Sequence, residues 1–103
     1  MSRKRPRTEE EDRVRFIRAR ETWNRRKGVG IHPDHDWDIE LTLLAMRDRL
    51  ADCLGIEFSI DHIVPLGRGG PHHHTNLRAI PHSLNVRKGD KLDAEMKNPP
   101  FAA

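Results

Sequence analysis

Cysteine, aromatic residues and long apolar runs are all scarce in this 103-residue chain, which has one cysteine, no tyrosine and five aromatic residues. The single cysteine, Cys53, excludes an intramolecular disulfide and every zinc site that needs two or more cysteines. No apolar run approaches the roughly 18 residues that cross a bilayer, and no apolar stretch follows the basic N-terminus as in a secretory signal. We therefore expect one small cytoplasmic domain, alone or with an arm, that does not enter membranes.

Charge is abundant and unevenly distributed. The formal net charge is only +3, but residues 1–28 carry +6, residues 29–61 carry −6 and residues 62–103 carry +3. A strongly basic end suits contact with a polyanion such as DNA. Charge alone leaves an equally good alternative, a solvated tail that binds nothing.

The first predicted helix lies in the basic end. Thr8 followed by Glu11 fits a capping box, and acidic residues fill the first turn, as a helix N-terminus favours. Gly28 or Gly30 should end this helix. Arginines surround a thin apolar stripe, so the helix suits docking on a core, tracking of phosphates, or both.

A second helix is predicted over roughly 37–54, with Asp34 or Asp36 as its N-cap and Gly55 at its end. Apolar residues recur along it at helical spacing. The face that we expect to pack in the core consists of Ile39, Leu43, Met46, Leu50 and Leu54.

The second half of the chain alternates strand-like and helical segments, which predicts an α+β fold. Side chains alternate with a period of two over 56–62, and a loop rich in glycine follows. A second extended segment is predicted at 76–80. A helix should run from Pro81 to Lys88, and a last helical segment from Asp90 to about residue 97.

The residues that can carry chemistry concentrate between positions 58 and 90. Asp61 is an oxygen ligand directly before His62, a titratable base, and Asn85 lies on the following helix. Neighbours on a regular strand point to opposite faces, so Asp61 and His62 converge only if the strand ends or bulges there. The alternative is a loop-rich turn in which each polar side chain only satisfies backbone groups.

These residues carry a family resemblance. The string Asp61-His62-Ile63-Val64-Pro65, then Asn76-Leu77, then Asn85 with Lys88-Gly89-Asp90, resembles the motif of HNH endonucleases, the ββα-metal or His-Me finger superfamily, and is most similar to small bacteriophage HNH proteins. The resemblance covers residues from about 50 to 92. It implies a ββα-metal finger with a supporting helix over 37–54, in an HNH nuclease domain over 31–103 preceded by a basic N-terminal helical arm over 1–30.

The resemblance also assigns roles. His62 is similar to the general base that deprotonates water, and Asn76 to the residue that holds the loop and orients that base. Asp61 and Asn85 resemble the ligands of one divalent cation, Mg²⁺ in the first place, with Mn²⁺ or another divalent ion as alternatives. The implied reaction is hydrolysis of a phosphodiester bond, as a nick or a double-strand cut, leaving a 5′-phosphate.

DNA is the implied partner, with a phage terminase or a second copy of the chain as further candidates, in the host cytoplasm if a phage encodes the protein. We expect the following basic residues to contact nucleic acid: Arg87, Lys88, Lys91, Arg18, Arg25 and Arg26. The alternative function is a non-catalytic nucleic-acid-binding or phage DNA-packaging accessory protein.

The chain departs from the family in one respect. Many members carry two Cys-x-x-Cys pairs around this motif, but here residues 81–84 read Pro-His-Ser-Leu, so no structural zinc is expected. The other histidines suggest no complete ligand set. We interpret His32, His35 and residues 72–74 as loop residues, and His82 as a surface residue.

Overall fold

The computed structural model describes residues 5–97, and the chain divides into two compact units, Met1–Gly30 and Ile31–Ala103. The first unit consists mainly of helix α1, Glu9–Arg26. Its predicted capping box is confirmed, because the Thr8 hydroxyl accepts from the Glu11 amide at 3.2 Å and the Glu11 carboxylate accepts from the Thr8 amide at 3.3 Å. Gly28 follows the helix with φ 71°.

Helix α2, Trp37–Leu54, opens the second unit with the predicted boundaries. The Asp36 carboxylate caps it by accepting from the amides of Asp38 at 2.9 Å and Ile39 at 3.2 Å. Gly55 ends it in the left-handed conformation, with φ 69°, which glycine adopts without steric penalty. The caps alone therefore set both ends of α2.

The predicted core face of α2 is wrong in part, since Leu43 and Leu50 are half-buried but the other three residues are exposed. Ile39, Met46 and Leu54 are 40%, 48% and 60% exposed, whereas Glu40 on the same helix is buried. α2 packs mainly on the two strands, so a narrow face is covered, and Glu40 on that face makes hydrogen bonds with the buried His35 and His72. The spacing of apolar residues in the sequence cannot reveal that a carboxylate is buried.

Two antiparallel strands form the sheet, β1 (Phe58–His62) and β2 (Leu77–Pro81), in a register that pairs Phe58 with Pro81 and His62 with Leu77. Their long connection contains two 3₁₀ turns. Within it Gly70 is packed so closely against residue 64 that an added Cβ would collide with the Val64 carbonyl group.

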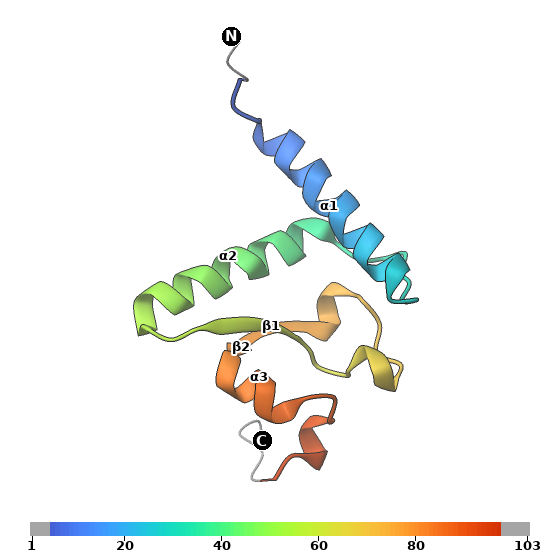
Figure 1. The fold of residues 1–103 in the computed structure, drawn as a ribbon, viewed down its shortest axis with the longest axis vertical. Helices are drawn as coiled ribbons and strands as arrows, with labels where there is room; N and C mark the ends of the chain where they lie inside the picture. The colour runs from blue at the N-terminus through green and yellow to red at the C-terminus, as the bar shows by residue number, and fades with distance from the viewer. Residues whose placement is uncertain (1–4, 98–103) are drawn as a thin grey trace. The chain divides into compact units, whose positions relative to one another are not determined.

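Helix α3, His82–Lys88, follows β2 directly and ends at Gly89, as predicted. Figure 1 shows α2 on one side of the hairpin and α3 on the other, so β1 lies between two helical layers. The predicted helical segment over 90–97 is wrong except for one 3₁₀ turn, Asp93–Glu95, whose two acidic side chains bind Arg78 and Arg68.

The described residues thus form a small α+β fold with three helices and a two-stranded antiparallel sheet. Their buried side chains are mostly polar, since only Leu77, Ile80 and Met96 are buried hydrophobic residues. Across residues 5–97, no helix has the length and apolar character that crossing a membrane requires.

Candidate functional site

A pocket of about 310 Å³ lies where β1 ends, beside α3. Asp61, His62 and Asn85 all line it, so three predicted site residues from two distant segments share one cavity. Asp90 lines it as well, a carboxylate that the sequence analysis did not assign to the site. The strand ends at His62, which allows two sequence neighbours to border the same space.

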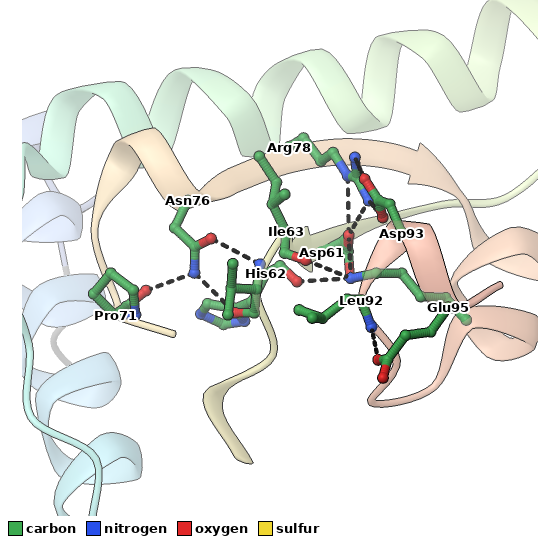
Figure 2. Close-up of polar contacts among 11 residues, drawn as sticks. Asp61, His62, Ile63, Pro71, Asn76, Arg78, Leu92, Asp93 and Glu95 are labelled. Atoms are coloured by element: carbon green, nitrogen blue, oxygen red, sulfur yellow. Dashed lines mark hydrogen bonds and ion pairs between the residues drawn. The ribbon is translucent and has the colours of Figure 1, made fainter. Parts of the chain in front are cut away.

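Asp61 is buried, at 5% exposure, and two cations hold its carboxylate. The Lys88 ammonium lies 3.0 Å from each oxygen, and Arg78 donates from Nε to Oδ2 at 3.0 Å. Arg78 also makes a two-pronged pair with Asp93, at 2.9 Å and 2.7 Å, as Figure 2 shows. The Arg78 hydrogen bonds lower the pKa of Asp93 below its ordinary value of 3.8.

Lys88 is fully buried rather than exposed on α3. Besides Asp61, its ammonium donates to the carbonyl oxygens of His62 at 2.9 Å and Ile63 at 3.0 Å. Lys88 therefore fixes the backbone at both His62 and Ile63. This placement argues against the predicted phosphate contact by Lys88, because the ammonium would have to leave four oxygen atoms to reach DNA.

The pocket oxygens suit a hard divalent cation. Asp61 offers a carboxylate, Asn85 an amide oxygen and Asp90 a second carboxylate, the donor types that Mg²⁺ prefers. Oδ1 of Asp61 accepts one hydrogen bond, from Lys88, and a carboxylate oxygen can accept a second interaction. Both Asp61 oxygens are already bound by Lys88 and Oδ2 also by Arg78, so an ion held by Asp61 and Asn85 stays a prediction, with Asp90 as an additional candidate ligand.

Asn76 is buried and holds the loop that follows His62. Its amide oxygen accepts from the Val64 amide at 2.9 Å, and its amide nitrogen donates to the carbonyl oxygens of Val64 at 3.0 Å and Pro71 at 2.9 Å. All three bonds are to backbone groups, so Asn76 fixes the main chain two residues after His62 (Figure 2). Its contribution to catalysis stays a prediction.

A second polar cluster lies behind His62. His62 Nε2 is 3.0 Å from His72 Nδ1, His72 Nε2 is 2.6 Å from Glu40 Oε1, and His35 Nε2 is 2.9 Å from the same oxygen. His35 and His72 lie in connecting segments, as predicted, but they are not ordinary loop residues, since they are only 8% and 2% exposed. The one sequence signal was Glu40, a charged residue between apolar neighbours on α2.

His35, Glu40 and His72 could hold a metal ion, because their nearest ligand atoms all lie within 4.8 Å of one another. Burial is the main cause that lowers the pKa of His35, and the neighbouring His72 adds to it, so His35 is neutral at pH 7. Its Nδ1 atom is buried and makes no hydrogen bond with any residue between positions 5 and 97. A histidine that binds a metal through one ring nitrogen usually donates a hydrogen bond from the other ring nitrogen. His35 Nδ1 makes no such hydrogen bond with residues 5–97.

The remaining predicted contacts to nucleic acid lie on the surface. Arg87 and Lys91 are exposed after the hairpin, and Arg18, Arg25 and Arg26 are exposed on α1. His82 is exposed too, and its Nδ1 is 2.7 Å from the Ser59 hydroxyl. Basic side chains are thus accessible in both units, as binding to a phosphate backbone requires.

No protein-family model matches the chain, and neither a curated protein nor a solved structure matches it. The class that the structure itself defines is a small α+β domain in which a β-hairpin and a short helix border an open pocket lined by polar and apolar residues.

Proposed function

We propose that this protein is a metal-dependent DNA endonuclease of the HNH type. The observation that carries the proposal is the pocket itself, which Asp61, His62 and Asn85 line together although 22 residues separate His62 from Asn85 in the sequence. A base and two oxygen ligands around one cavity are the groups that phosphodiester hydrolysis needs.

In the proposed reaction, the neutral imidazole of His62 accepts a proton from the attacking water. Asp61 and Asn85 hold the divalent cation, which when bound stabilises negative charge on the phosphate and on the leaving 3′-oxygen. Asn76 and Lys88 keep the main chain around His62 in place from two directions. Exposed Arg87 and Lys91 bind the DNA backbone beside the pocket.

The deciding experiment is cleavage of supercoiled plasmid DNA by the full chain with Mg²⁺ or Mn²⁺, and with a chelator added. We expect nicked or linear product only with metal, and a fall in rate of roughly 10²–10⁴-fold for His62→Ala with DNA binding retained. His82→Ala is the matched control, because His82 is exposed on α3 and does not line the pocket. Absence of cleavage with every divalent metal would refute the proposed endonuclease function.

Exposed arginines on α1 support a second candidate, a nucleic-acid-binding or DNA-packaging accessory protein without catalysis. The same assay separates the two, since this candidate binds DNA equally well with metal or chelator and never cuts it. Cutting of both strands by the proposed enzyme would need a second copy or a partner such as a phage terminase.

A further inference from the structure

We propose that Glu40 and His72 act as a positioning pair that holds His62 with its proton on Nε2 and its lone pair on Nδ1. The inference rests on the proposed function, in which His62 is the base. It adds two residues, one on α2 and one in the hairpin connection, to a site that the motif places only on β1, α3 and the loop between them.

Glu40 sets the direction of each hydrogen bond in the cluster. An ionised carboxylate only accepts, so with Glu40 ionised the ring nitrogens of His72 and His35 beside Oε1 both carry protons. With one proton on each imidazole, His72 has its proton on Nε2 and a lone pair on Nδ1. That lone pair faces His62 Nε2 at 3.0 Å, so His62 donates there and its own lone pair is on Nδ1.

Glu40 and His72 are both held in fixed positions. Glu40 is 1% exposed and His72 2% exposed, so neither side chain can turn toward solvent. The main chain of His72 is also fixed, because residues 31 and 72 form a parallel bridge and the His32 amide donates to the His72 carbonyl at 3.1 Å. A buried, doubly anchored acceptor gives His62 one orientation and one tautomer.

The distances around Glu40 Oε1 distinguish this hydrogen-bonded arrangement from a metal ion bound in the same cluster. Tetrahedral ligands about 2.0–2.2 Å from zinc are separated from each other by roughly 3.3 Å. The observed separations of 2.6 Å and 2.9 Å are instead those of hydrogen bonds. A metal on His72 Nε2 would also move the His72 proton to Nδ1 and reverse the tautomer of His62.

The first test reads the tautomer directly and needs no activity. Side-chain ¹⁵N spectra of the full-length protein, at a pH where His62 is neutral, should show a protonated Nε2 and an unprotonated Nδ1. A protonated Nδ1 on His62 would overturn the inference. If this tautomer is found but the protein cleaves no DNA, the positioning pair stands and the proposed function fails.

The second test uses two substitutions of His72. The amide oxygen of His72→Asn can lie near the position of Nδ1 and accept from His62, whereas His72→Leu cannot. In the plasmid assay we expect His72→Leu to reduce kcat roughly 10²–10³-fold with KM nearly unchanged, and His72→Asn to restore at least tenfold of that loss. Equal losses in two variants with wild-type thermal unfolding would contradict a positioning role.

Metal analysis completes the design. The purified wild-type protein should contain no stoichiometric zinc, and added zinc should not raise its thermal unfolding midpoint. One tightly bound transition-metal ion per chain, lost in both His72 variants, would overturn the positioning pair and assign the cluster to a metal site.

Discussion

Lys88 is fully buried and its ammonium contacts four oxygen atoms. Its ammonium is withdrawn from solvent and is balanced by the Asp61 carboxylate and two carbonyl oxygens. Removal of one partner from a buried ion pair leaves the other charge without compensation, which destabilises a protein far more than the intact pair stabilises it. The pair therefore couples the candidate metal ligand to the stability of the fold.

Substitution Lys88→Met should lower the free energy of unfolding by about 3 kcal/mol, because the buried Asp61 charge keeps only Arg78 as its cation and the carbonyl oxygens of His62 and Ile63 lose their donor. Urea denaturation followed by circular dichroism measures the change. Lys91→Met is the matched control, since Lys91 is exposed, and it should change stability by less than about 0.5 kcal/mol. Equal effects of the two substitutions would show that the buried pair contributes little.

Asp93 gives the fold a defined dependence on acid. Its folded-state pKa lies below the ordinary 3.8 because of the Arg78 hydrogen bonds, so the unfolded chain takes up a proton first as the pH falls. The stabilisation is present above pH 3.8 and is lost as the pH falls through the lowered value. Asp93→Asn should therefore lower stability by about 1 kcal/mol at pH 6 and by progressively less as the pH falls below 3.8, in unfolding curves measured across acidic pH.

Among the elements, the connection between β1 and β2 decides the shape of the pocket. Its first turn packs Gly70 against the Val64 carbonyl group, and Asn76 binds both backbone groups of Val64 from the other end. These contacts hold the chain immediately after His62. The motif spacing indicates that such a loop exists, but the close approach at Gly70 depends on the folded path.

Gly70→Ala should destabilise the protein by about 1–3 kcal/mol and reduce cleavage, because the new Cβ would force the backbone away from Val64. Gly67→Ala is the control for stability in the same loop, since a Cβ there meets no described atom within 4 Å. The comparison needs thermal unfolding of both variants and the plasmid assay on Gly70→Ala beside the wild type, because Gly67 itself lines the pocket. A tolerated alanine at position 70 would mean that the loop adapts without moving His62.

At the scale of the whole molecule, opposite charges separate along the chain. The +6 of residues 1–28 lies within the first unit, where some arginines are already paired, since Arg5 binds Glu11 at 2.6 Å and Arg7 binds Asp12 at 2.7 Å. Arg20 stacks its guanidinium over Trp23, 5.6 Å from the ring centroid. Arg18, Arg25 and Arg26 are exposed and stay the predicted contacts to phosphate in this unit.

The combined substitution of Arg18, Arg25 and Arg26 by Gln should weaken binding to duplex DNA of any sequence. It should also flatten the plot of log affinity against log salt by about 0.9 for each arginine that contacts a phosphate. Fluorescence anisotropy at several salt concentrations measures both, with Arg49→Gln, an exposed arginine on α2, as control. An unchanged slope would make α1 a solvated or protein-binding helix.

The sequence by itself determined the local structure of this protein. Capping residues, left-handed glycines and the change from helical to alternating periodicity act over a few neighbouring residues, and they predicted α2, the hairpin and α3 closely. The spacing of Asp61, His62 and Asn85 likewise indicated residues that meet, and they line one pocket.

Only the tertiary structure decided which side chains are buried and what they contact. Whether Glu40 or Ile39 faces the sheet depends on where α2 packs, and whether Lys88 faces solvent depends on Asp61, 27 residues earlier. The approach of His72 to Glu40 joins positions 32 residues apart. Such polar contacts produce no periodic pattern in the sequence, because each one depends on two distant segments that meet only in the folded protein.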